Sequence, residues 1–249
     1  MQYLLFSSWL HITLKPNTLY LTLFAARSRQ MTIESNVKVS VPKKWMDGWD
    51  KIYSQMLSAS DDELSRIDVG PRIQQLEHAL AITESDTQSM RILELGCGDG
   101  SVACYLAKIG CNVVAIDALV SAIAVAQRRS KLLKLEDKVE FRLDDMDGWP
   151  LKPESYDVVI ALQCLQYLFD RTIPRLREAI AAVKPGGFFV YSGNILPHME
   201  TDPPIRFVTE EELKAELDGW TYHGFGTEER MIKLDDLRGY VWTVARKPM

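Results

Sequence analysis

The sequence contains few cysteines, and none of them forms a Cys-x-x-Cys pair. The 249 residues include 4 cysteines, at positions 97, 104, 111 and 164. No histidine stands near them at the spacing of a zinc site, which excludes the common zinc modules. All four fall within predicted core segments or a glycine-rich loop. We therefore expect reduced thiols, no bound metal and a reducing compartment such as the cytoplasm.

An excess of positive charge is also absent. Lysine and arginine number 29 against 34 aspartates and glutamates, which gives a net charge of -5 and a pI near 5.5. Proteins that bind a nucleic-acid backbone carry basic patches, so we expect no nucleic-acid partner. The chain is 47% hydrophobic and is long enough for one substantial core and an appendage. Composition leaves the oligomeric state open between a monomer and a homodimer.

The sequence also lacks an apolar run long enough to cross a bilayer, so we expect no membrane partner. The first 26 residues are apolar in patches, but they are interrupted by His11, Lys15, Pro16 and Asn17. No acid precedes Glu34, which fits either a mitochondrial transit peptide or a stretch upstream of a translation start at Met31. We therefore treat residues 1–40 as an N-terminal extension. A chain that begins at Met31 is expected to fold and bind its ligand as well as the full chain.

What the sequence does have is an apolar segment that runs into alternate glycines, at residues 91–101 (RILELGCGDGS). Gly96, Gly98 and Gly100 allow backbone angles that a Cβ would forbid, and they let backbone amides approach a ligand closely. The dinucleotide fingerprint Gly-x-Gly-x-x-Gly needs a third glycine where this chain has Ser101. The loop therefore favours a nucleotide-like ligand other than NAD.

Four further apolar segments predict buried strands, at residues 112–117, 139–146, 156–162 and 183–191. The first ends in Asp117, about 20 residues after the glycines, where a carboxylate can accept both hydroxyls of a ribose. The second carries the adjacent acids Asp144 and Asp145, which are well placed to meet an adenine amino group. These acids and the glycine loop would meet at the carboxyl ends of a parallel sheet.

The flanking segments complete an α/β pattern. Residues 73–82 predict an amphipathic helix, and Thr209 begins a second helix with a capping-box pattern. Alternation at residues 220–225 and 240–246 predicts two more strands, which makes seven. Three aromatic residues follow one another at about one helical turn, at Trp45, Trp49 and Tyr53. This spacing is typical of core packing and also fits a lid over a ligand.

Five of these segments, in this order, resemble the motif set of class I S-adenosylmethionine (SAM)-dependent methyltransferases. The matching residues are ELGCGDG, VVAID, the LDD of the third strand, YDVVIALQCLQYL and VKPGGFFVYSG, within residues 90–247. The resemblance implies an α/β fold with a doubly wound, seven-stranded, mostly parallel Rossmann-like sheet whose last strand is antiparallel. It also implies that residues 41–249 form a SAM-dependent methyltransferase domain with an N-terminal helical lid.

The resemblance assigns roles to the residues that match these motifs. Cofactor binding falls to the glycine loop and the ends of three strands, at Glu94, Gly96, Cys97, Gly98, Gly100, Asp117, Ala118, Asp144, Asp145, Met146, Leu162 and Gln163. The acceptor pocket falls to the lid and to the segment after the fourth strand, at Trp45, Trp49, Tyr53, Cys164 and Tyr167. Plain helix packing is the alternative role for this second group.

The C-terminal half is more specifically similar to the tellurite-resistance (TehB-like) methyltransferases. The matching residues are Thr172-Ile-Pro174, Lys184-Pro-Gly-Gly187, Pro204 with Phe207, Asp218-Gly-Trp220 and Ala245-Arg-Lys247. Those enzymes are thought to use a His-Arg pair between the last two strands, whereas this chain has Arg230 without a neighbouring histidine. Only Arg230 carries over, so the resemblance does not decide for an oxyanion such as tellurite or selenite.

Methyl transfer from a sulfonium asks little of side chains, because alignment and the exclusion of water lower most of the barrier. An acceptor that carries a proton needs a base, and His198 is the candidate. Arg206 and Arg230 are the candidates for holding an anionic acceptor. All three would act as catalytic residues.

Three classes of function remain open at this point. The first is methylation of a small molecule, either a metalloid oxyanion or an organic compound with an oxygen, nitrogen or sulfur acceptor. The second is methylation of a macromolecule such as a protein, and the third is a binding module that keeps the fold without turnover. The fourth strand ends in Ala-Leu-Gln-Cys164 and not in the Asn/Asp-Pro-Pro-Tyr type of sequence that amine-methylating nucleic-acid enzymes carry. We therefore favour the first class.

Overall fold

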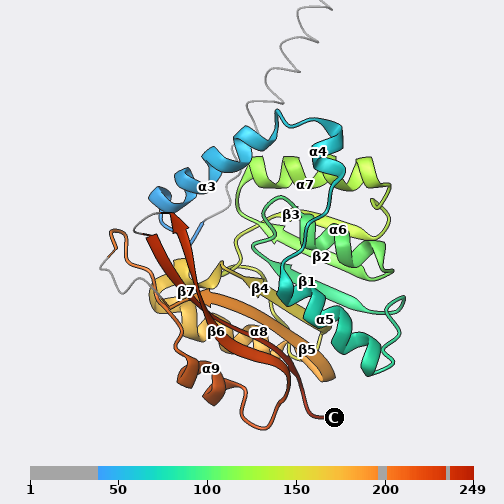
Figure 1. Cartoon of the computed structure of the whole chain (residues 1–249), viewed down its shortest axis with the longest axis vertical. Coiled ribbons are helices and arrows are strands. Elements are labelled where there is room, and N and C mark those ends of the chain that lie inside the picture. Colours follow the sequence, from blue (N-terminus) through green and yellow to red (C-terminus); the bar gives the residue numbers. More distant parts are fainter. Residues whose placement is uncertain (1–38, 196–200, 234–235) are drawn as a thin grey trace, which may run out of the picture. The chain divides into compact units, whose positions relative to one another are not determined.

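The computed structural model describes residues 39–195, 201–233 and 236–249, which contain one seven-stranded sheet (Figure 1). Its strands are β1 (Arg91–Leu95), β2 (Asn112–Asp117), β3 (Val139–Leu143), β4 (Tyr156–Leu162), β5 (Val183–Asn194), β6 (Thr221–Lys233) and β7 (Asp236–Arg246). They lie in the order β3-β2-β1-β4-β5-β7-β6. Pairing is parallel from β3 to β5, whereas β7 is antiparallel to both β5 and β6. The predicted fold class is confirmed.

The helices begin where the sequence offers suitable first residues. They are α3 (Lys43–Met56), α4 (Asp61–Ser65), α5 (Pro71–Ile82), α6 (Ser101–Lys108), α7 (Val120–Leu133), the 3-10 helix η1 (Leu165–Arg171), α8 (Thr172–Ala181) and α9 (Glu210–Glu216). Pro71 stands at the first helical position of α5, where its missing N–H costs nothing. Thr209 and Glu212 form the predicted capping box of α9. None of the described helices is long and apolar enough to cross a membrane.

The core lies on both faces of the sheet. Successive residues of a strand point to opposite faces, and Ile92 and Leu93 of β1 accordingly pack into different hydrophobic clusters. The cluster around Ile92 includes residues of α5 and α6, and the cluster around Leu93 includes residues of α8 and α9. Helices therefore cover both faces, as a largely parallel sheet requires.

The strand order reverses between β1 and β4, because β2 and β3 lie on one side of β1 and the later strands lie on the other. Ligands of such sheets bind beside this reversal, at the carboxyl ends of the strands. The glycine loop follows β1 there and Gln163 follows β4. The fold thus brings these two segments together at the carboxyl ends of β1 and β4.

The β6–β7 hairpin is longer than the predicted strands at 220–225 and 240–246. Pairing between β5 and β7 ends at Asn194 and Tyr240, whereas pairing between β6 and β7 continues to Lys233 and Asp236. The outer half of the hairpin carries many charged residues, so the apolar alternation that predicts a strand does not extend into it. The hairpin consequently extends past the carboxyl end of β5, on the side of the glycine loop.

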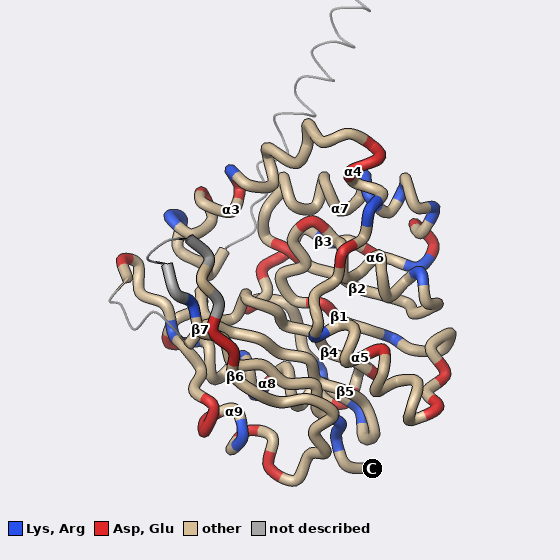
Figure 2. Tube along the Cα trace, viewed as in Figure 1, with Lys and Arg blue, Asp and Glu red and all other residues tan. Residues whose placement is uncertain are grey.

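Charge does not single out one region of the described chain. Figure 2 shows acidic and basic residues interspersed over its helices, strands and loops.

Candidate active site

The loop after β1 is built from glycines in the left-handed region. Gly96, Gly98 and Gly100 have φ angles of 67°, 53° and 73°. A Cβ on Gly96 would lie 2.6 Å from the Cβ of Cys164, and a Cβ on Gly100 would lie 2.7 Å from the Cβ of Ala126. Neither position has room for a side chain, so glycine is required at both, and the loop passes from β1 to α6 as bare backbone at these residues.

Asp117 at the end of β2 is fixed against this loop. Its Oδ2 accepts a hydrogen bond from the amide of Gly98 at 2.9 Å, and its Oδ1 accepts one from the amide of Leu119 at 3.0 Å. Burial raises the pKa of the Asp117 carboxyl, and these backbone bonds act in the opposite direction. A carboxylate oxygen has a second lone pair, so Asp117 can still accept hydrogen bonds from a ligand.

Glu94 of β1 lies buried behind the loop. Its side chain is only 4% exposed, and its Oε2 has no hydrogen-bond partner. Burial raises the pKa of Glu94 well above its ordinary value of 4.5, and the nearby charges of Asp99 and Asp117 raise it further. The folded protein therefore holds a proton on Glu94 over a pH range in which the unfolded chain has lost it.

We expect Glu94→Gln to stabilise the ligand-free protein at pH 8 relative to wild type and to have little effect near pH 4. Below pH 4.5 the Glu94 carboxyl is protonated in both the folded and the unfolded state, so it makes no pH-dependent contribution to stability there. As pH rises, the unfolded state ionises first and is favoured, until the raised pKa of the folded state is reached. Melting temperatures of both proteins across this range measure the difference.

Glu63→Gln is the matched control, because Ser60 lowers the pKa of this exposed carboxyl through hydrogen bonds. Glu63→Gln should be less stable than wild type at high pH and about as stable as wild type at low pH. This change in stability has the opposite sign to that of Glu94→Gln. If the melting temperatures of wild type and Glu94→Gln differed by the same amount at every pH, Glu94 would be ionised in the folded protein as it is in the unfolded chain.

Asp145 follows β3 and is tied to the segment before α3. Its Oδ2 accepts a hydrogen bond from the amide of Ser40 at 2.6 Å, and its Oδ1 accepts one from the amide of Asp147 at 3.1 Å. Asp144 instead accepts from the amide of Asp145 through its own carboxylate, at 2.8 Å. Asp145 is therefore the member of the acidic pair that faces the N-terminal segment, and Asp144 holds the turn.

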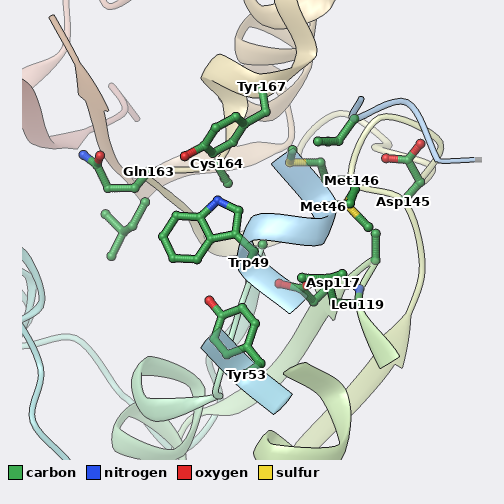
Figure 3. A pocket seen from close by; sticks show the side chains of 14 residues that line it. Met46, Trp49, Tyr53, Asp117, Leu119, Asp145, Met146, Gln163, Cys164 and Tyr167 are labelled. Atoms are coloured by element: carbon green, nitrogen blue, oxygen red, sulfur yellow. Dashed lines mark hydrogen bonds between the residues drawn. The ribbon is translucent and has the colours of Figure 1, made fainter. Parts of the chain in front are cut away.

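Helix α3 brings aromatic side chains over the glycine loop (Figure 3). Trp49 stacks on Tyr53 at a centroid distance of 6.1 Å and meets Tyr167 edge-on at 6.4 Å. The Tyr53 hydroxyl lies against Gly98, at the place where a side chain of residue 98 would begin. Burial raises the pKa of Tyr53, followed by the negative charge of Asp117, so this hydroxyl stays protonated. Trp45 packs against Tyr167 at 5.6 Å.

These groups enclose a cavity of about 200 Å³, which we call the cofactor cavity. Of the residues predicted from sequence, it is lined by Gly96, Asp117, Ala118, Asp145, Met146, Leu162, Gln163, Trp49, Tyr53, Cys164 and Tyr167. The predicted residues outside its lining are Glu94, Cys97, Gly98, Gly100, Asp144 and Trp45. Sequence reasoning missed Val41, Met46 and Leu119, which also line it.

A second cavity of about 360 Å³ adjoins the first. The two share four lining residues, which are Trp49, Leu162, Gln163 and Tyr167. Its remaining walls come from the start of α5, the end of β5 and the β6–β7 hairpin. Two ligands bound in these cavities would therefore meet at the shared wall.

Gln163 stands in this shared wall in a strained backbone conformation. Its φ of 57° lies in the left-handed region, which is uncommon for a residue with a side chain. The amide of Gln163 donates to the carbonyl of Ser192 at 2.8 Å, and its Nε2 donates to the Ser192 hydroxyl at 3.1 Å. Such strain collects at functional sites.

Comparison with known proteins agrees with this geometry. Residues 92–187 match the family model for a methyltransferase domain. Residues 92–187 are thus similar to a methyltransferase domain. The match begins in β1 and ends within β5, so it includes the glycine loop, Asp117 and Gln163.

Relatives of the methyltransferase domain act on different compounds. The chain is 27% identical over 168 residues to a fatty-acid O-methyltransferase of Mycolicibacterium smegmatis, which covers 64% of this chain and 57% of the relative. It is 34% identical over 106 residues to a ubiquinone biosynthesis O-methyltransferase of Hydrogenovibrio crunogenus, covering 42% and 43%. The chain thus spans about half the length of these relatives.

Solved structures show the same fold. TehB from Haemophilus influenzae has a TM-score of 0.55 and 21% identity, and the match covers 70% of this chain and 61% of TehB. At this identity the likeness shows the fold alone.

The site has features that suit SAM, the methyl donor of the proteins to which the chain is similar. The glycine loop contributes Gly96 to the lining of the cofactor cavity, and Glu94 leaves a buried oxygen without a partner behind it. Asp117 would accept the ribose hydroxyls, and Asp145 with Met146 would hold the adenine. The residues present therefore fit this cofactor.

Of the three predicted catalytic residues, only Arg206 has a side chain that the structure describes. The guanidinium of Arg206 pairs with Glu212 and with the carbonyl of Phe207, and Arg206 lines neither cavity. Arg230 belongs to β6, where its backbone lies opposite Arg238. His198 lies outside the described residues. Arg206 is therefore held by the start of α9.

Arg129 of α7 is a buried residue that sequence reasoning missed. Its side chain is 3% exposed and pairs with Asp99 of the glycine loop at 2.6 Å. It also donates to the carbonyls of Leu64 at 2.6 Å and Arg66 at 2.8 Å, at the end of α4. Arg129 therefore ties the glycine loop to the end of α4.

We expect Arg129→Ala to lower the free energy of unfolding by about 3 kcal/mol, because it removes the cation paired with the Asp99 carboxylate and leaves the carbonyls of Leu64 and Arg66 without this donor. The adjacent Arg128 is 36% exposed and pairs with Asp61 at 2.5 Å. Arg128→Ala should cost under about 1 kcal/mol, as exposed ion pairs do. Urea unfolding of the two variants makes the comparison, and equal losses would mean that burial of Arg129 contributes nothing.

Proposed function

We propose that this protein transfers a methyl group from SAM to a small organic molecule. The observation that carries the proposal is the pair of adjoining cavities, which share a wall at Trp49, Gln163 and Tyr167. One cavity has the glycine loop and the acids that suit SAM. The other has a size typical of pockets for small molecules. The resemblance to relatives that methylate lipid-like compounds supports an organic acceptor over a macromolecule.

SAM supplies an electrophilic methyl group on a positively charged sulfur. The protein's own residues would align the donor with the acceptor and exclude water. Asp117 and the loop amides would fix the donor, while Trp49 and Tyr53 of α3 cover it and exclude water. The strained backbone at Gln163 fixes the shared wall through its two bonds to Ser192. An acceptor held at this wall would lie beside the donor, and one that carries a proton would in addition need a base.

An organic acceptor is favoured over a metalloid oxyanion for two reasons. Arg206, a predicted anion-binding residue, is paired with Glu212, so its charge is already compensated. The second cavity has a volume of about 360 Å³ and includes the apolar side chains of Ile73 and Leu162. An oxyanion would leave such a space largely unfilled.

The test is incubation of the purified protein with methyl-labelled SAM and a panel of carboxylic acids, phenols, amines, thiols, tellurite and selenite. We expect label in one class of organic compound and formation of the demethylated cofactor, with less of both for Asp117→Ala at a SAM concentration that does not saturate the variant. Labelled tellurium or selenium products would support the oxyanion class instead. SAM binding without transfer to any member would favour a binding module.

A further inference from the structure

We propose that Trp49 recognises the positive charge of the methyl donor through the face of its ring, and so distinguishes SAM from its demethylated product. This inference rests on the proposed function and assigns a specificity-determining residue to it. In methyl transfer, a lone pair of the acceptor forms the new bond to the methyl carbon, and the electrons of the sulfur–methyl bond stay on the sulfur. The sulfonium cation thus becomes a neutral thioether. A group that stabilises only the cation favours binding of the donor over retention of the product.

The charged sulfur has to lie at the shared wall of the two cavities, because the methyl group passes there from one ligand to the other. Of the described residues, four line both cavities, namely Trp49, Leu162, Gln163 and Tyr167. None of these four side chains is an acid or a base that is charged at neutral pH. At this wall the positive charge of the donor therefore meets neutral groups.

The tyrosines beside Trp49 do not supply a negative charge. Burial raises the pKa of Tyr167, and burial followed by the negative charge of Asp117 raises the pKa of Tyr53. Both hydroxyls therefore stay protonated, and neither becomes a phenolate that could pair with the sulfonium. The acids of the cofactor cavity, Asp117 and Asp145, are the residues that suit the ribose and the adenine.

The two residues of the shared wall that are not aromatic are less suited to hold a cation. Leu162 is apolar. Gln163 is engaged with β5, because its side-chain amide donates to the Ser192 hydroxyl at 3.1 Å and its main-chain amide donates to the Ser192 carbonyl at 2.8 Å. The faces of the aromatic rings are then the groups at this wall that attract a positive charge, through the negative face of their quadrupole.

Trp49 is the ring best placed and best suited for this role. Its plane is inclined by 21° to that of Tyr53 and by 80° to that of Tyr167. The faces of Trp49 and Tyr53 are therefore nearly parallel, whereas Tyr167 meets Trp49 at close to a right angle (Figure 3). Indole attracts a cation more strongly than the other aromatic side chains, and exclusion of water increases the effect. Trp45 lies one turn earlier on α3, packs on Tyr167 and lines neither cavity.

The test is calorimetric titration with three ligands that differ at the sulfur position. They are SAM, its demethylated product, and sinefungin, in which a carbon that bears an ammonium group replaces the sulfonium. The quantity compared is the Kd of the demethylated product divided by the Kd of each charged ligand. We expect Trp49→Leu to lower both ratios by about fivefold, as loss of a partly desolvated cation–π contact does. Trp49→Phe keeps a smaller aromatic face and should lower the ratios less.

Trp45→Leu is the matched control, because it removes the same kind of side chain from the same helix outside both cavities. Its ratios should stay within about twofold of wild type. No residue of α3 is buried, so we expect these variants to keep the wild-type circular dichroism spectrum. Equal weakening of all three ligands in Trp49→Leu, or the same fall of the ratios in Trp45→Leu, would overturn the inference and leave the proposed function intact. Failure of the wild-type protein to bind any of the three ligands would overturn both.

Discussion

Gly98→Val should weaken SAM binding by about 100-fold or more, which corresponds to roughly 2.7 kcal/mol. The φ of Gly98 is 53°, a region that a β-branched residue avoids, and the new Cβ would collide with the Tyr53 hydroxyl. The protein can relieve this only by moving the lid or by turning the loop. A turned loop would break the bond from the Gly98 amide to Asp117. Isothermal titration calorimetry measures the loss directly.

Gly48→Val is the control for this prediction, because Gly48 lies exposed on α3 and has nothing within 4 Å of its would-be Cβ. It should bind SAM within about twofold of wild type, since surface substitutions away from special features have small effects. The Gly98 variant should keep its circular dichroism spectrum, because the strain at one residue is of order 1–3 kcal/mol. Unchanged affinity in Gly98→Val would mean that the loop does not bind the cofactor.

Asp117→Ala is expected to weaken the binding of SAM and of its demethylated product by about 1.5–3 kcal/mol, the range for a lost charge-assisted hydrogen bond. Asp117 also organises its surroundings, because it accepts from the amides of Gly98 and Leu119. Both amides lose their acceptor in the variant. The loss should therefore appear for both ligands in calorimetry, since both contain the same ribose.

Asp157→Ala provides the matched control, because Asp157 is an acid of the same sheet with comparable bonds. It accepts from the amide of Arg91 at 2.8 Å and pairs with Lys184 at 2.9 Å, at the opposite ends of β1 and β4 from the glycine loop. Its removal should affect stability and leave SAM affinity unchanged. Equal loss of affinity in both variants would show that Asp117 acts only through general stability.

The strand pattern and the loop at the reversal point could be predicted from sequence because local chemistry dictates them. Alternate glycines after an apolar segment are typical of a loop that binds a ligand through its backbone, and an acid that ends the next strand must lie beside them in a parallel sheet. The mostly parallel direction of the seven strands and the antiparallel last strand were implied by the family resemblance. The hairpin was predicted too short, because the pairing of β6 with β7 outlasts the apolar alternation that marks it.

The orientation of the N-terminal helix could not be read from its sequence. Trp45, Trp49 and Tyr53 share one face, yet only Trp49 and Tyr53 line the cofactor cavity, while Trp45 packs on Tyr167. Met46 and Val41 line the cavity although they resemble ordinary core residues. Which apolar side chain meets a ligand depends on the rotation of α3 against the sheet, and no local pattern fixes that rotation.

The second cavity and Arg129 were missed for a related reason. Arg72 and Glu228 are far apart in sequence and meet only because α5 packs beside the hairpin. Arg129 and Arg128 are neighbours in a charged stretch, and only tertiary contacts make one of them buried. One signal was present, since Arg129 falls on the same helix face as the buried residues Val125 and Ala126.

The most direct test of the central claim is calorimetric titration of the wild-type protein with SAM, its demethylated product and NAD. The glycine loop lacks the third glycine of the dinucleotide fingerprint, and the cofactor cavity has the acids that suit a ribose and an adenine. We predict saturable one-to-one binding of SAM and of its product, and no binding of NAD. Tight binding of NAD without binding of SAM would contradict the account.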